Sequence, residues 1–215
     1  MEPAFWHKRW ADNQIGFHQS QVNPYLQAHW PMLAPGSQVL VPLCGKSLDV
    51  AWLAGQGYRV LGVEMSQRAV ADFFREHSLE AEVSRHGAFE TWRSGLVEMW
   101  CGDFFALQAE DLAQCTGLYD RAAVIALPQA LRTRYFELLS ACLPAACQGL
   151  MVTLDYDQSR LDGPPFSVPD DEVRRGFAGW QEVAELEAPD IIEDSPKFQK
   201  AGVGSLMERV YRLQR

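Results

Sequence analysis

Short apolar runs alternate with amphipathic stretches between residues 38 and 155. Residues 38–43 (Gln-Val-Leu-Val-Pro-Leu) predict a buried strand, and residues 47–56 predict a helix whose apolar positions gather on one side. The alternation then continues, with strands expected at 59–63, 96–101, 119–126 and 149–155 and helices at 67–77 and 129–142. Strands and helices that alternate at this spacing form βαβ units, so the pattern predicts an α/β fold with a mainly parallel sheet.

The first thirty residues depart from this alternation because they are rich in aromatic side chains. Trp6 and Trp10 stand four positions apart, so on a helix they share one face. Two interpretations stay open for residues 1–30: a helix that caps the core, or a lid over a ligand. The chain shows no internal repeat and no long linker, so we expect one domain over residues 1–215.

The last third of the chain predicts an antiparallel end to the sheet. Residues 167–172 (Ser-Val-Pro-Asp-Asp-Glu) predict a helix start, with Ser167 as its cap and acidic residues in the first turn. Residues 181–192 and 205–213 alternate like two further strands. We therefore expect seven strands in all, with a hairpin after the parallel part.

Composition removes several classes of function. The chain has 19 Lys and Arg against 28 Asp and Glu, a net charge of −9, which makes it a poor partner for nucleic-acid phosphates. No apolar stretch approaches the roughly 18 residues of a membrane helix, and the N-terminus does not resemble a signal peptide. The five cysteines include no CxxC pair and the five histidines no HxH or HExxH, so neither a disulfide framework nor a metal site is predicted. We expect a cytoplasmic protein, by default a monomer.

Candidate chemistry lies where the predicted strands end. In open parallel sheets, ligands bind beyond the carboxyl ends of the strands. The first loop holds a single glycine, Gly45, where a dinucleotide site needs G-x-G-x-x-G. Gly45-Lys46-Ser47 resembles the end of a P-loop, but position 40 is Leu where that motif requires Gly. The loop therefore fits neither phosphate-binding pattern.

Glu64 ends the second predicted strand, 19 residues after Gly45. An acidic residue at this place accepts hydrogen bonds from a ribose diol in nucleotide-binding folds. The alternative is a solvated glutamate at a strand end, without function. Glu64 can bind a ribose, but the loop at Gly45 lacks the glycines that bind a pyrophosphate. This combination favours a nucleoside cofactor that carries no phosphate, and S-adenosylmethionine is the obvious candidate.

Several segments resemble the thiopurine S-methyltransferase family in its bacterial form, over essentially the whole chain. They are residues 5–10 (Phe-Trp-His-Lys-Arg-Trp), 15–19 (Ile-Gly-Phe-His-Gln), 41–47 (Val-Pro-Leu-Cys-Gly-Lys-Ser), 62–64 (Gly-Val-Glu), 119–122 (Tyr-Asp-Arg-Ala) and 163–166 (Gly-Pro-Pro-Phe). Pro-Leu-Cys-Gly-Lys in the first loop, followed late in the chain by Gly-Pro-Pro-Phe, is a specific combination.

This resemblance implies a Rossmann-like class I methyltransferase fold, with a seven-stranded sheet, an antiparallel last strand and helices on both faces. It also implies S-adenosylmethionine as the methyl donor. The residues implied at the cofactor are Trp6, Trp10, Leu43, the Cys44-Gly45 backbone, Glu64, Gly102, Asp103, Phe104 and Arg121. Those implied at the acceptor are Phe17, Pro164, Pro165 and Lys197, the last standing where mammalian relatives carry an arginine. Arg121 lies where cofactor and acceptor meet.

The resemblance implies methyl transfer to small aromatic or heterocyclic thiols, and selenium or tellurium compounds are further candidate acceptors. Such thiols are largely ionised near neutral pH, so the reaction needs no strong general base. Arg121 is the candidate for stabilising the anionic acceptor; its alternative role is an ion pair with a neighbour such as Asp120. Two other functions stay open at this point. One is a nicotinamide-dependent oxidoreductase, although this chain lacks the glycines of the dinucleotide-binding motif. The other is a non-catalytic module that binds a nucleoside.

Overall fold

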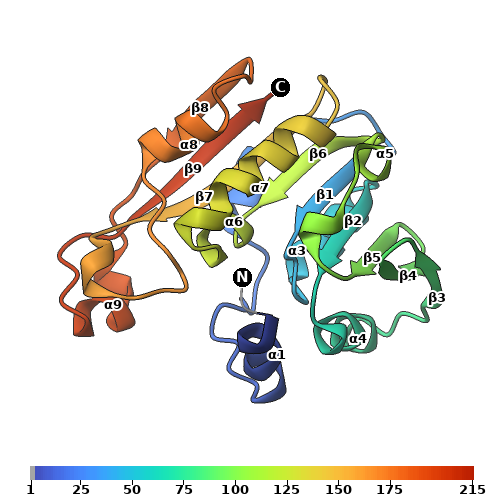
Figure 1. Ribbon diagram of the computed structural model, residues 1–215, viewed down its shortest axis with the longest axis horizontal. Helices are drawn as coiled ribbons and strands as arrows, with labels where there is room; N and C mark the ends of the chain where they lie inside the picture. The colour runs from blue at the N-terminus through green and yellow to red at the C-terminus, as the bar shows by residue number, and fades with distance from the viewer. Residues whose placement is uncertain (1–2) are drawn as a thin grey trace.

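The computed structural model describes residues 3–215, and its centre is a mixed sheet (Figure 1). In chain order the strands are β1 (Gln38–Pro42), β2 (Arg59–Glu64), β3 (Glu82–His86), β4 (Phe89–Ser94), β5 (Val97–Cys101), β6 (Cys115–Asp120), β7 (Gln148–Asp155), β8 (Glu182–Glu187) and β9 (Met207–Gln214). Across the sheet the order is β3-β4-β5-β2-β1-β6-β7-β9-β8. The five strands from β5 to β7 pair in parallel, β9 runs antiparallel to β7 and β8, and the β3–β4 hairpin runs antiparallel along β5.

Helices cover both faces of the sheet. They are α1 (Pro3–Ala11), α2 (Pro24–His29), α3 (Leu48–Gly55), α4 (Gln67–Glu76), α5 (Ala109–Leu112), α6 (Ala123–Ala126), α7 (Gln129–Cys142), α8 (Asp170–Gly176) and α9 (Pro196–Lys200), with 3-10 turns η1 (Phe104–Ala106), η2 (Gln158–Arg160) and η3 (Ile192–Asp194). Successive side chains of β1 point to opposite faces of the sheet, so they pack in both hydrophobic clusters. Leu40 joins the cluster under α5 to α8, whereas Val39 and Val41 join the cluster under α2 to α4. No helix among the described residues is long and apolar enough to cross a bilayer.

The α/β class, the parallel centre and the antiparallel end of the sheet are confirmed, but the described residues form nine strands where seven were expected. The additional pair is the β3–β4 hairpin. β3 is exposed at all five positions, so it carries no apolar periodicity. Its partner β4 alternates only in part, with Phe89 and Thr91 buried. The seven strands inferred from buried runs are therefore those of the central sheet, and the hairpin extends one edge.

Two local predictions were wrong. The strand expected at 119–126 ends at Asp120, and Ala123–Ala126 forms α6 instead. Asp120 Oδ1 accepts hydrogen bonds from the backbone N–H of Ala123 (2.8 Å) and Val124 (3.3 Å), which starts a helix where the apolar run alone predicts a strand. Ser167 is not the cap of α8, because its hydroxyl accepts from the N–H of Tyr156 (2.9 Å) and the helix begins one residue after Pro169.

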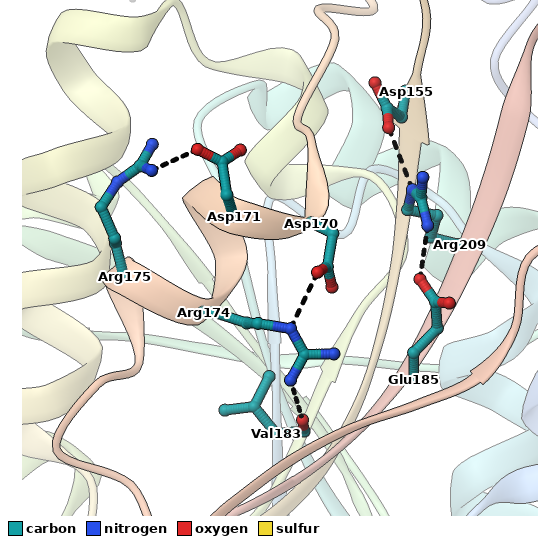
Figure 2. Close-up of polar contacts among 8 residues, drawn as sticks. All are labelled: Asp155, Asp170, Asp171, Arg174, Arg175, Val183, Glu185 and Arg209. Carbon is teal, nitrogen blue, oxygen red and sulfur yellow. Dashed lines mark hydrogen bonds and ion pairs between the residues drawn. The ribbon is translucent and has the colours of Figure 1, made fainter.

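Ion pairs hold the antiparallel end of the sheet together (Figure 2). Arg209 of β9 donates to Asp155 of β7 (3.0 Å) and to Glu185 of β8 (2.6 Å), so one guanidinium joins three strands. Arg174 of α8 pairs with Asp170 (2.8 Å) and donates to the carbonyl of Val183 (3.0 Å), which ties the helix to β8. Arg209 thus fixes the carboxyl end of β7, at Asp155, to the two antiparallel strands, so these contacts serve the fold.

Candidate cofactor and acceptor site

The carboxyl edge of the parallel strands carries the predicted first loop, and α1 lies across it (Figure 1). After β1 the chain turns sharply, with Leu43 at φ 46° and Gly45 at φ 55°, both in the left-handed region. A Cβ on Gly45 would lie 3.1 Å from Cζ2 of Trp10, so the bare glycine is what lets the indole of α1 rest on the turn. Ser47 then caps α3 by accepting from the N–H of Asp49 (3.2 Å).

Glu64 joins this turn to the end of β2. Its side chain is buried, and its two carboxylate oxygens accept from the backbone N–H of Gly45 (2.9 Å) and of Ser66 (2.8 Å). Burial raises the pKa of Glu64, and the hydrogen bonds from the backbone oppose the rise. Each carboxylate oxygen has a second lone pair, so the group retains the capacity to accept from a pair of hydroxyls.

Aromatic packing holds α1 in place over the loop. Phe17 makes edge-on contacts with both Trp6 and Trp10, with 5.7 Å between ring centroids in each case. The predicted shared face of Trp6 and Trp10 is therefore confirmed, and Phe17 is the residue that covers it. Residues 1–2 of the predicted N-terminal segment lie outside the described part of the chain.

A cavity of about 450 Å³ opens between the ends of β2 and β5, where it is lined by Met65 and Ser66, the residues directly after Glu64. Its walls come from the strand ends, from α1, from the start of α4 and from the extra hairpin, through His7, Ala11, Met65, Ser66, Gln67, Arg68, Glu90, Cys101 and Gly102. Of the predicted cofactor residues 102–104, Gly102 lines this cavity. Asp103 instead caps η1 by accepting from the N–H of Phe105 (3.0 Å), and Phe104 is buried in the core against Tyr135.

Arg121 follows β6 and pairs with a residue that the sequence patterns did not single out. Its Nε lies 3.5 Å from Oδ2 of Asp49, rather than pairing with the adjacent Asp120. Asp49 is 1% exposed and also accepts from the hydroxyl of Tyr119 (2.9 Å) and the N–H of Asn23 (2.8 Å). The carboxylate thus fixes Arg121 at the edge of the sheet and leaves other guanidinium donors for a ligand.

Asp120 is occupied by the fold. Besides starting α6, it accepts from the hydroxyl of Tyr135 (2.7 Å) and is fully buried. Burial raises the pKa of Asp120 to about 6, and the hydrogen bonds from Tyr135 and the backbone oppose the rise. A carboxylate engaged on this many sides is a poor candidate for a general base.

The predicted acceptor residues gather in two groups. Lys197 of α9 donates to the carbonyl of Pro164 (3.4 Å), and Pro165 accepts from the hydroxyl of Tyr156 (2.7 Å). Phe17 belongs to the aromatic group of α1. Burial lowers the pKa of Lys197, and the charge of Arg9 lowers it further.

The cavity residues other than Gly102 were not predicted to function there. Outside the cavity lining, Arg9, His18 and Asp49 are three further residues that the sequence analysis did not assign. Arg9 and His18 lie inside the quoted family segments, which was the one available signal. Burial lowers the pKa of His18, and the charge of Lys46 lowers it further. Asp49 sits in a helix without any motif, so only the folded chain brings it to Arg121. Within residues 3–215 no group of three or more His, Cys, Asp or Glu side chains is arranged to hold a metal ion.

The fold is that of the class I S-adenosylmethionine-dependent methyltransferases. Solved structures of this class share the fold across 12–15% identity. A Burkholderia thailandensis 1,6-didemethyltoxoflavin-N1-methyltransferase with bound S-adenosylhomocysteine matches 99% of this chain and 87% of its own, with a TM-score of 0.64. A Methanosarcina mazei methyltransferase matches 91% and 98%, also with a TM-score of 0.64.

The family model described as Thiopurine S-methyltransferase (TPMT) matches residues 1–215. A thiopurine S-methyltransferase of Pseudomonas putida is 74% identical over 217 residues, covering all of both chains, and one of Azotobacter vinelandii is 59% identical with the same coverage. The chain belongs to the thiopurine S-methyltransferase family, whose methyl donor is S-adenosylmethionine.

Proposed function

We propose that the chain transfers the methyl group of S-adenosylmethionine to the sulfur of a small aromatic or heterocyclic thiol. The observation that carries the proposal is the buried carboxylate of Glu64, which accepts from the single-glycine turn at Gly45. The residues directly after Glu64 line a cavity of about 450 Å³. The relatives that are 59–74% identical are thiopurine S-methyltransferases, which supports a thiol as the acceptor.

The donor would be held by three neighbouring parts of the edge. Leu43, Cys44 and Gly45 offer backbone groups to its amino-acid portion, and Glu64 accepts from its ribose hydroxyls. The cavity that Gly102 lines takes the adenine, and Asp103 and Phe104 act on it only through the loop they shape. Trp6 and Trp10 place aromatic faces on the same side, where such a face favours a sulfonium by about 0.5–2 kcal/mol.

The chemistry is an in-line displacement. The thiolate sulfur forms a bond to the methyl carbon, the bond between that carbon and the sulfonium breaks, and its electron pair stays on the departing sulfur. The protein's task is to hold the two sulfur atoms in line with the methyl group in a site that excludes water. Arg121 is proposed to contact the acceptor and offset its negative charge, with its orientation set by Asp49.

On the acceptor side we propose Phe17, Pro164, Pro165 and Lys197 as the lining. α1 and the turn that follows it would act as a lid over the bound ligands. Residues 1–215 would form a single domain, and the chain would work as a monomer. All five cysteines are free, and the most buried of them, such as Cys44 and Cys115, have a raised pKa because burial disfavours the thiolate. Reduced, unreactive thiols support a cytoplasmic location.

The test begins with calorimetry of S-adenosylmethionine and S-adenosylhomocysteine, followed by an acceptor screen with methyl-labelled donor over aromatic thiols, selenite and tellurite. The proposal expects heat with both nucleosides and label on at least one aromatic thiol. Label on selenite or tellurite alone would move the acceptor class to those compounds. Binding without transfer to any acceptor would favour a nucleoside-binding module, and binding of NADH in place of the donor would overturn the proposal.

A further inference from the structure

The β3–β4 hairpin brings an acidic residue to the carboxyl edge of the parallel strands. Glu90 of β4 is the register partner of Cys101 of β5, and Cys101 is in turn the partner of Glu64 of β2. The three residues therefore lie in one row across adjacent strands, with roughly 4.8 Å between neighbouring strands. The pKa of Cys101 is raised to about 11, first by burial and then by the charges of Glu64 and Glu90, in agreement with this row.

Glu90 lines the cavity between the ends of β2 and β5, and its carboxylate is held from one side. Its Oε1 accepts from Nε2 of Gln67 (3.0 Å) and from the indole Nε1 of Trp92 (2.8 Å). Among the described residues no donor reaches Oε2, and Arg68 of the cavity wall pairs with Asp72 instead (3.7 Å). Since a carboxylate oxygen accepts up to two hydrogen bonds, Oε1 is filled and Oε2 is left for a ligand.

Asp103, the acid that the family resemblance implies at the cofactor, is engaged elsewhere. Its Oδ1 accepts from the N–H of Phe105 (3.0 Å) as the cap of η1, and it does not belong to the lining of the cavity. Among the described residues that line the cavity, Glu90 is the one acid. A donor group on a ligand in this cavity therefore meets Glu90 and not Asp103.

We infer that Glu90 is a specificity-determining residue for the methyl donor, whose Oε2 accepts a hydrogen bond from the exocyclic amino group of the nucleobase. The inference rests on the donor placement in the proposed function, with the ribose at Glu64 and the base in the cavity. An amino group donates where the carboxylate accepts. A 6-oxo base presents an oxygen to the same negative charge, which repels it and leaves both groups unpaired. The hairpin thereby selects adenine over hypoxanthine.

The experiment measures by calorimetry the affinity of the full chain for S-adenosylhomocysteine and for S-inosylhomocysteine, in which an oxygen replaces the amino group. Glu90→Gln makes a directional prediction. Gln67 and Trp92 both donate to Oε1, so the amide oxygen of the variant takes that place and its NH₂ takes the place of Oε2. An NH₂ in that position donates to the 6-oxo group and opposes the amino group.

The wild type is expected to bind S-adenosylhomocysteine about tenfold or more tightly than the 6-oxo analogue. Glu90→Gln is expected to narrow this preference about tenfold or more, by weakening the first ligand and strengthening the second, a gain that a merely structural role would not give. Glu98→Gln is the matched control, because Glu98 also accepts from an indole two residues further on, that of Trp100 (2.8 Å). It is expected to leave the preference unchanged.

Equal affinity of the wild type for the two nucleosides, or an unchanged preference in Glu90→Gln, would overturn the inference. So would an equal loss for both ligands, since Glu90 would then only tie the hairpin to α4. Thermal melts show whether the variant is folded. If it is not, Glu90→Asp decides: its shorter side chain is expected to reduce the preference roughly fivefold or more, and an unchanged preference overturns the inference. A wild-type chain that binds neither nucleoside overturns the proposed function as well, whereas one that binds both alike overturns the inference alone.

Discussion

Replacing Glu64 by Gln tests the central assignment because it keeps the shape of the side chain and removes its charge. The carboxylate accepts one hydrogen bond from Gly45 and one from Ser66, and an amide can accept only one of them. The other backbone N–H then faces an NH₂ group. A hydrogen bond to a charged group contributes about 1.5–3 kcal/mol, and removing a buried charge returns part of this, so we expect unfolding to become easier by about 1–2 kcal/mol.

Glu64→Gln should also weaken the binding of the donor and its product. The amide of Glu64→Gln keeps one acceptor oxygen where the carboxylate has two, so beside the backbone bond it can accept from one ribose hydroxyl and not from the pair. We expect the affinity for S-adenosylhomocysteine to fall about 10–100-fold, where each tenfold corresponds to about 1.4 kcal/mol. Calorimetry gives the affinity, and urea denaturation gives the stability on the same preparation.

Glu98→Gln is the matched control. Glu98 lies on β5, where it pairs with Arg93 (2.7 Å) and accepts from the indole of Trp100 (2.8 Å), away from the carboxyl edge. It should leave the affinity within twofold of the wild type. If Glu64→Gln loses stability but binds S-adenosylhomocysteine as the wild type does, the carboxylate only joins two loops and the ribose assignment is wrong.

Two further predictions follow from the same edge. Gly45→Ala places a side chain in the left-handed region and against Trp10, so we expect the free energy of unfolding to fall by about 1–2 kcal/mol and donor binding to weaken. Gly36→Ala, at φ 77° with open space around it, should show the backbone strain alone. Equal donor binding in the two variants would refute this prediction. Because burial raises the pKa of Asp120 to about 6, the stability this group contributes is full below about 3.8 and is lost as the pH rises through about 6. Relative to Asp120→Asn, the wild type should therefore lose roughly 2–2.5 kcal/mol between pH 4 and pH 7 in urea denaturation, and parallel pH profiles would contradict the raised pKa.

The fold was predictable where burial leaves a mark on the sequence. The central strands are buried on both faces, so they appear as apolar runs such as residues 38–42 and 149–153. β3 leaves no such mark because all its side chains are exposed. The apolar run after Asp120 misled the strand assignment, because whether it forms a strand or a helix is decided by hydrogen bonds to Asp120 and not by its periodicity.

The candidate site was predictable where it consists of strand ends. Gly45 and Glu64 are separated by a fixed βαβ unit, so their spacing alone brings them together, and the structure joins them by a hydrogen bond. Phe104 was assigned by its neighbours in the chain, but its ring turns into the core. Asp49 reaches Arg121 only through long-range packing, for which a single sequence carries no signal.

The buried carboxylate of Asp49 gives Arg121 two duties at once. Any substitution that removes the guanidinium withdraws a counter-charge from an acid that is 1% exposed, and so disturbs Tyr119 and the segment around Asn23 as well as the reaction. A variant without the guanidinium of Arg121 would thus lose both activity and stability. Lysine, which preserves the charge while losing the fork of donors, is the replacement that separates the two.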